Sequence, residues 1–159
     1  MVRTMMRFAG KGCVASLVLA AALLAAPPRT FDGSWQMDAA KSHVSDGRVV
    51  TLTIATSDDG IKLTMKTVTT DGKEVTSEFT SKLDGKACDA TEGAHKSQIT
   101  MWFNGPTLNA CKEDGPVGDV TSVWKFDLSP DKQTMTMKIS HYEPAGDEET
   151  LVFTKKASS

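Results

Sequence analysis

The sequence predicts an all-β protein that folds as an antiparallel, up-and-down β-barrel of about eight to ten strands. Three observations support this prediction. Short runs rich in threonine, valine and aromatic residues recur along the chain, turn residues separate these runs, and apolar residues alternate with polar residues inside them. The 159 residues, 40% of them hydrophobic, are enough for one domain with its own core.

Residues 1–26 have the features of a secretory signal peptide. Arg3, Arg7 and Lys11 come first without any acidic residue, and residues 13–26 then form an unbroken apolar run. This run is shorter than the roughly 20 residues that a membrane span needs. The alternative is an N-terminal anchor that is not cleaved.

We expect cleavage after Ala25 or Ala26, which would leave no transmembrane span in the mature protein and place it in the periplasm or outside the cell. The domain organisation that follows is a signal peptide at 1–26, a linker at 27–30, a barrel domain at 31–156 and a tail at 157–159.

The charge of the mature chain argues against nucleic acid and anionic membranes as partners. Three of the 18 basic residues lie in the leader, so 15 remain against 20 acidic residues, a net charge of about −5. Only two arginines, Arg29 and Arg48, remain in the mature chain, so no arginine cluster is available to bind phosphates.

The mature chain keeps two cysteines, Cys88 and Cys111, while Cys13 belongs to the leader. In an oxidising compartment such a pair predicts a disulfide, which would contribute about 3 kcal/mol of stability. The alternative, a metal site with two thiolates, has no further ligands at the usual spacing.

After the linker, each strand is predicted from a run of β-forming residues. We expect strands at 31–37, 49–55, 61–68, 74–83, 97–103, 107–112, 120–128, 134–142 and 150–154, with a shorter candidate at 87–89. Turn residues stand between most of them: Asp58-Asp59-Gly60, Asp71-Gly72, Asp84-Gly85, Asn104-Gly105-Pro106, Asp114-Gly115, Ser129-Pro130-Asp131 and Pro144-Ala145-Gly146-Asp147.

The alternation inside the runs gives each strand one buried face and one solvated face. Leu52 and Ile54, for example, oppose Thr51 and Thr53. Short connections make sequence neighbours into sheet neighbours, and a meander of this length has open edges unless it closes into a barrel. A two-sheet sandwich is the alternative.

Residues 38–47 interrupt the pattern. Asp38 to Lys41 could form one helical turn capped by Asp38, and in a barrel this stretch would lie as a lid or plug after the first strand. An ordinary connector is the other interpretation.

The first strand carries a resemblance to a known family. Gly33-Ser34-Trp35 resembles the Gly-x-Trp signature that opens lipocalin-type barrels, and residues 33–42, 83–86 and 128–136 resemble small exported bacterial proteins with a lipocalin-like barrel and no assigned activity. The chain lacks the Thr-Asp-Tyr type element of lipocalins and the arginine that covers the first-strand tryptophan. Lys155 or Lys156 could cover Trp35 instead.

No residue pattern predicts an enzyme or a cofactor. The sequence has no Gly-x-Ser-x-Gly elbow, His-Glu-x-x-His helix, Gly-rich phosphate loop or Cys-x-x-Cys pair. His43, His95 and His141 are scattered, and acidic pairs stand in turns, where solvation explains them better than a metal ion does.

The leading functional hypothesis is a barrel that binds a small apolar or amphipathic ligand. His141 continues the apolar face of its strand and could orient a ligand at the barrel mouth, and methionines suit an adaptable pocket. The predicted lining consists of Trp35, Leu52, Ile54, Leu63, Met65, Phe79, Met101, Trp124, Met137 and His141.

The alternative is a filled barrel, stapled by the disulfide, that acts through its loops as an envelope-associated inhibitor or interaction module. Trp102 is expected on the outer face, beside the turn that begins at Asn104, where it could anchor a protein partner.

Overall fold

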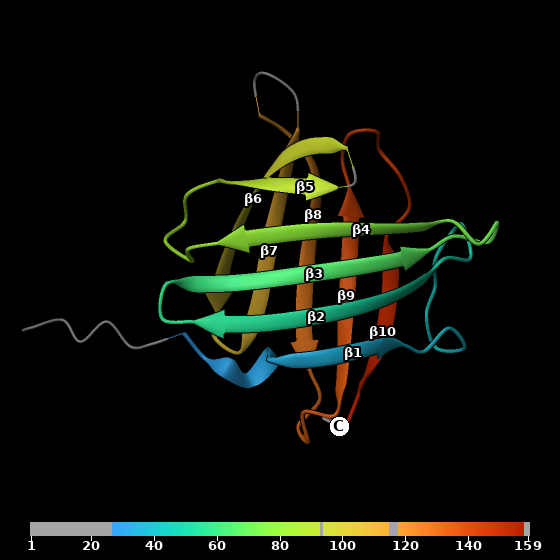
Figure 1. The fold of residues 1–159 in the computed structure, drawn as a ribbon, viewed down its shortest axis with the longest axis horizontal. Helices are drawn as coiled ribbons and strands as arrows, with labels where there is room; N and C mark the ends of the chain where they lie inside the picture. Colours follow the sequence, from blue (N-terminus) through green and yellow to red (C-terminus); the bar gives the residue numbers. More distant parts are fainter. Residues whose placement is uncertain (1–26, 93, 115–117, 158–159) are drawn as a thin grey trace, which may run out of the picture.

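The computed structural model describes residues 27–92, 94–114 and 118–157 and confirms the predicted fold (Figure 1). Ten antiparallel strands form one closed barrel in which each strand pairs with its sequence neighbours and the last pairs with the first. The strands are β1 (Gly33–Met37), β2 (Val49–Ser57), β3 (Gly60–Val68), β4 (Glu74–Ser81), β5 (Cys88–Glu92), β6 (His95–Asn104), β7 (Thr107–Asp114), β8 (Asp119–Leu128), β9 (Thr134–His141) and β10 (Glu149–Lys155).

Several strand boundaries differ from the predictions. The first strand begins at Gly33 and not at Phe31, because Phe31 belongs to the short 3₁₀ helix Arg29–Phe31. The short candidate at 87–89 is the beginning of β5, which extends to Glu92. In contrast, β4 ends at Ser81 and not at Leu83, since Leu83 has a φ of +59° and a left-handed residue cannot continue a strand.

The segment 38–47 is an irregular connector and contains no helix. The Asp38 carboxylate accepts a hydrogen bond from the Ala40 N–H (3.1 Å) in a turn. His43 then pairs with Thr150 through two backbone hydrogen bonds, and Val44 packs against the core. These contacts hold the connector against β10 at one end of the barrel.

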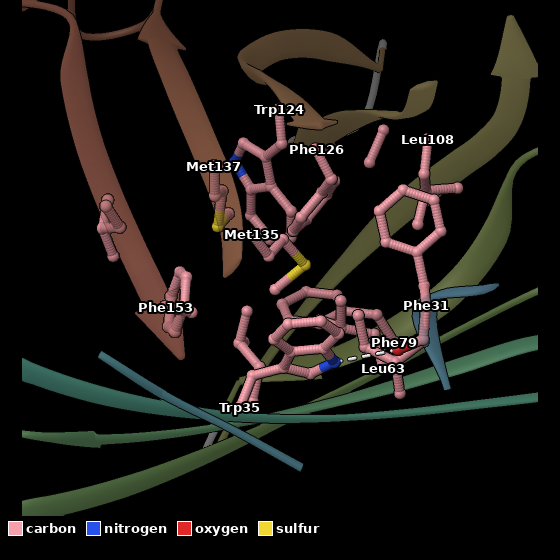
Figure 2. Close-up of a cluster of buried hydrophobic side chains, with 14 of the residues drawn as sticks. Phe31, Trp35, Leu63, Phe79, Leu108, Trp124, Phe126, Met135, Met137 and Phe153 are labelled. Carbon is pink, nitrogen blue, oxygen red and sulfur yellow. Dashed lines mark hydrogen bonds between the residues drawn. The ribbon is translucent and has the colours of Figure 1, made fainter. Parts of the chain in front are cut away.

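The inward faces of the strands form a single packed core (Figure 2). Trp124 makes an edge-on contact with Phe79, with 5.0 Å between ring centroids, and a similar contact with Phe126 at 6.5 Å. Trp35 is fully buried, and its Nε1–H donates a hydrogen bond of 2.8 Å to the Phe31 carbonyl, drawn as a dashed line in Figure 2. The alternation of the sequence therefore predicted the buried face correctly.

The Gly-x-Trp element has a physical reason in this barrel. The Lys155 ammonium lies 5.1 Å from the centre of the Trp35 ring, which confirms the expectation that a lysine covers Trp35. A Cβ on Gly33 would lie 2.9 Å from Lys155 Cε, and Gly33 has a φ of +130°. Glycine thus leaves the space through which the lysine stem reaches the indole.

The two ends of the barrel are different. One end is closed by η1 (Arg29–Phe31), from which the fully buried Phe31 packs against Phe103 at 6.0 Å. The connections between β1 and β2, β3 and β4, and β9 and β10 gather at the opposite end, toward the right and top of Figure 1. This second end is called the mouth below.

The structure corrects the predicted disulfide, because both thiols are free. Cys88 pairs with Ile99 on β6 and shares its inward face, whereas Cys111 pairs with Thr100 and faces outward. With β6 between them, their Cα atoms are separated by about two strand spacings, roughly 10 Å. A disulfide requires less than about 7 Å and converging Cβ atoms, so neither condition is met.

The predicted signal peptide at 1–26 lies outside the described residues, and so does most of the tail. Within the part of the chain that the structure describes, no helix is long and apolar enough to span a membrane.

Candidate functional site

A cavity of about 480 Å³ opens at the mouth of the barrel. Met65, Trp124 and Ile139 supply apolar surface to it, while Ser77 and Ser122 add hydroxyl groups. These residues continue the inward faces of β3, β4, β8 and β9 toward the mouth. A cavity of this size suits a small molecule.

Trp124 forms the boundary between the cavity and the core. Its Nε1–H donates a hydrogen bond of 2.9 Å to Ser122 Oγ, and Phe79 packs against the indole from the core side. Only 5% of the Trp124 surface is exposed, so the ring is held by contacts on nearly every side. The interior beyond it is filled with side chains, which confines a ligand to the mouth.

Arg48 and Glu149 form an ion pair across the beginnings of β2 and β10. Arg48 Nη2 lies 2.5 Å from Glu149 Oε2 and Nη1 lies 3.1 Å from Oε1, in a two-point contact. Their side chains are 17% and 6% exposed. Asp46 adds a second contact to Arg48 at 2.9 Å, and Ser45 donates from both its N–H and its hydroxyl to Glu149 Oε1.

The electrostatics of this cluster favour the charged forms of both partners. Burial by itself would raise the pKa of Glu149, but the hydrogen bonds and charge of Arg48, with contributions from Ser45 and His141, lower it to about 2. Burial would likewise lower the pKa of Arg48, yet Glu149 and Asp46 together raise it. Glu149 is therefore a fixed carboxylate at any physiological pH.

Two further contacts between charged or titratable side chains lie at the mouth, on strands β5, β6 and β7. Lys112 contacts Glu92 in an ion pair with side chains 17% and 25% exposed. Beside it, His95 Nε2 lies 2.6 Å from Asp114 Oδ2. The cavity is thus apolar at its floor and charged around its rim, the arrangement that accommodates an amphipathic molecule.

A wider groove of about 910 Å³ lies next to the cavity, between the connector 38–48 and the loop 144–149. It shares Arg48 and His141 with the cavity. His141 Nε2 lies 3.3 Å from Glu149 Oε2, so the three side chains form a partition between the two spaces.

The structure places three of the ten predicted lining residues at the cavity, namely Met65, Trp124 and His141. His141 stands at the mouth, as its position on the apolar face indicated. The other seven are buried in the packed core and do not line the cavity: Trp35, Leu52, Ile54, Leu63, Phe79, Met101 and Met137.

Sequence reasoning missed the charged residues of the rim, although a signal for them exists. Arg48 precedes Val50 by two residues, Glu149 precedes Leu151, Lys112 follows Ala110 and Glu92 follows Ala90. Each therefore continues the inward alternation by one step beyond the apolar run, which places its side chain inside the barrel mouth.

Other candidate features remain apart from the cavity. Among the residues that the structure describes, no group of three or more histidine, cysteine, aspartate or glutamate side chains could hold a metal ion. Trp102 lies on the outer face with 37% of its surface exposed, in agreement with its expected orientation.

Comparison with known proteins supports the fold. No family model and no curated protein matches the chain. Among solved structures, human cRBP IV is similar with a TM-score of 0.51 and 10% sequence identity, over 79% of this chain and 97% of that one. The likeness agrees with the observed architecture, a closed, antiparallel, lipocalin-like β-barrel.

A second similar structure comes from the de novo design of a fluorescence-activating β-barrel. It aligns with a TM-score of 0.43 and 13% identity, over 80% of this chain and 95% of that one. At 10% identity, the likeness to human cRBP IV concerns the fold alone.

Proposed function

We propose that this protein binds a small amphipathic molecule in the cavity at the barrel mouth. The observation that carries the proposal is the cavity itself, about 480 Å³ with Met65, Trp124 and Ile139 at its floor and ionised side chains at its rim. Such a surface can bury a short apolar group against the floor while the polar head stays hydrated at the rim. The similarity to human cRBP IV supports a barrel suited to this role.

The filled core limits the length of the ligand that the cavity can hold. Because Trp124 and Phe79 close the floor by their edge-on contact, an apolar tail cannot extend toward Phe31 at the closed end. The proposed ligand is therefore short or compact, and it differs from a long chain threaded through the barrel.

We also propose that the protein is exported, like the bacterial lipocalin-like group that its first strand resembles. The basic residues and apolar run of the leader support this. The intact mass of the protein isolated from its native cells tests it, since export predicts loss of the residues up to Ala25 or Ala26. A full-length mass would contradict cleavage.

Native mass spectrometry of the mature protein, compared with the same sample after denaturation, tests ligand binding. We expect an added mass that is present only in the native spectrum. In a Ser77→Leu variant the new side chain would fill the cavity and the added mass should disappear, because Ser77 points inward and is 7% exposed.

Thr76→Leu provides the matched control, since Thr76 is the exposed neighbour of Ser77 on the same strand. This variant should keep the added mass. The proposal would be refuted if the native spectrum showed no added mass and titration showed no binding of small amphiphiles. The outer surface around Trp102 would then be the better candidate for a binding site.

A further inference from the structure

We propose that the mouth cavity selects a cationic head group, such as an alkylammonium, over a carboxylate. This inference rests on the proposed function and adds the charge class of the ligand. It derives from which of the rim charges are already neutralised and which are not.

Negative charge is in excess around the cavity. Asp46, Glu92 and Glu143 line it together with the cations Arg48 and Lys112. Two further carboxylates, on Glu149 and Asp114, contact lining residues directly. Five carboxylates thus surround two permanently charged cations, Arg48 and Lys112, and two imidazoles, those of His95 and His141.

Both cations are already paired. Arg48 contacts the carboxylates of Asp46 and Glu149, and Lys112 contacts that of Glu92. An anionic ligand would have to displace one of these carboxylates and leave it without its partner in a partly buried position, which is costly. The Arg48 pair is the harder to open because Glu149 is only 6% exposed and holds several hydrogen bonds.

A cationic ligand needs no such displacement. Glu143 lines the cavity, and no hydrogen bond or ion pair engages its side chain within the described residues. The indole of Trp124 at the floor adds an aromatic surface, which attracts a cation. Nearby, the loop 142–148 carries Glu143 and Asp147 and no basic residue, whereas its third acid, Glu148, is paired with Lys138. The net field of this loop therefore draws cations toward the mouth.

Three octyl compounds with different heads test the proposal: octyltrimethylammonium, octanoate and octanol. Their binding to the full mature protein is followed by calorimetry, with tryptophan fluorescence as a second readout. The short tail suits the size of the cavity. We expect octyltrimethylammonium to bind more tightly than octanol, and octanoate to bind most weakly.

Two substitutions at the rim move the preference in a predicted direction. Glu143→Gln should weaken octyltrimethylammonium binding by about two- to fivefold, because Glu143 is exposed and water screens its charge. Glu92→Gln should weaken it similarly and strengthen octanoate binding, since Lys112 then lacks its partner. Glu78→Gln is the control, because it removes a carboxylate whose partner, Lys62, lies on the outer face of the barrel.

The outcomes separate this inference from the proposed function. If octanoate binds as tightly as octyltrimethylammonium, or if Glu143→Gln has no more effect than Glu78→Gln, the charge selectivity is refuted while binding in the mouth stands. If no octyl compound binds at all, the proposed function fails and the inference fails with it.

Discussion

Replacing Glu149 by glutamine is the most direct test of the ion pair that closes one side of the mouth. The substitution keeps the size of the side chain and one amide oxygen that can still accept from Ser45. It removes the negative charge opposite Arg48, which is 17% exposed in its side chain and would then be compensated by Asp46 alone.

The magnitude follows from the pKa of Glu149. A carboxylate with an ordinary pKa of 4.5 and a folded-state pKa of about 2 contributes about 3 kcal/mol to folding at neutral pH. Solvent screening reduces this contribution little, because the Glu149 side chain is 6% exposed. We therefore expect Glu149→Gln to lower the free energy of unfolding by about 2–3 kcal/mol at pH 7.

The pH dependence has a definite sign. Because the folded-state pKa of Glu149 is depressed, its stabilisation is complete above pH 4.5 and disappears as the pH falls toward 2. Urea unfolding of wild type and variant at several pH values should therefore show a difference that is constant down to about pH 5 and about half as large near pH 3.

Glu78→Gln is again the matched control, since Glu78 and Lys62 are both about half exposed, and its effect should stay below about 0.5 kcal/mol. A Glu149→Gln variant as stable as wild type at pH 7 would refute the reasoning. So would a stability difference that does not shrink between pH 5 and pH 3.

Two further predictions concern the cysteines and a glycine. Denatured, unreduced mature protein should show two titratable thiols. In the folded protein, Cys111 should react slowly with thiol reagents, because burial raises its pKa. A disulfide-bonded protein without titratable thiols would contradict the strand positions of Cys88 and Cys111. Gly60→Ala should lower the free energy of unfolding in urea by about 2 kcal/mol or more, because its Cβ would lie 2.1 Å from the Ser81 carbonyl oxygen. Gly72→Ala should lower it by only about 1 kcal/mol, the strain of its positive φ, because a Cβ at Gly72 would have no atom within 4 Å. Equal losses for the two glycine variants would contradict the close contact.

The barrel could be predicted because its information is local. Alternation with a period of two identifies which side chains point inward, and turn residues such as Asp71-Gly72 mark where each strand reverses. Both signals lie within a few residues of each other in the chain. Closure then followed from the short connections and the need to pair the edge strands.

The disulfide prediction failed because strand register is not a local property. Counting an even pair of cysteines says nothing about the face that each occupies. Cys88 lies opposite Ile99 and faces inward, whereas Cys111 lies opposite Thr100 and faces outward. Because Ile99 and Thr100 are consecutive residues of β6, their side chains point to opposite faces of the sheet, and so do the two cysteines.

The candidate site escaped prediction for a related reason. The alternation identified the wall residues but not which end of the barrel would be filled. That depends on Phe31, which η1 folds back into the closed end, and on Trp124, which Phe79 holds across the interior. The Arg48 to Glu149 pair joins residues 101 positions apart, beyond the reach of any local pattern.

The contrast between the two ends bears on what the mouth is for. At the closed end the barrel is stabilised by tightly packed apolar side chains such as Phe31 and Phe103. At the mouth, Arg48, Glu149 and Lys112 occupy inward positions where apolar residues of similar size would stabilise the fold as well or better. Stability alone therefore does not account for these charges. Their arrangement, in which each cation is held by at least one carboxylate and Glu143 has no ion-pair partner among the described residues, fits the proposed discrimination between ligands of opposite charge.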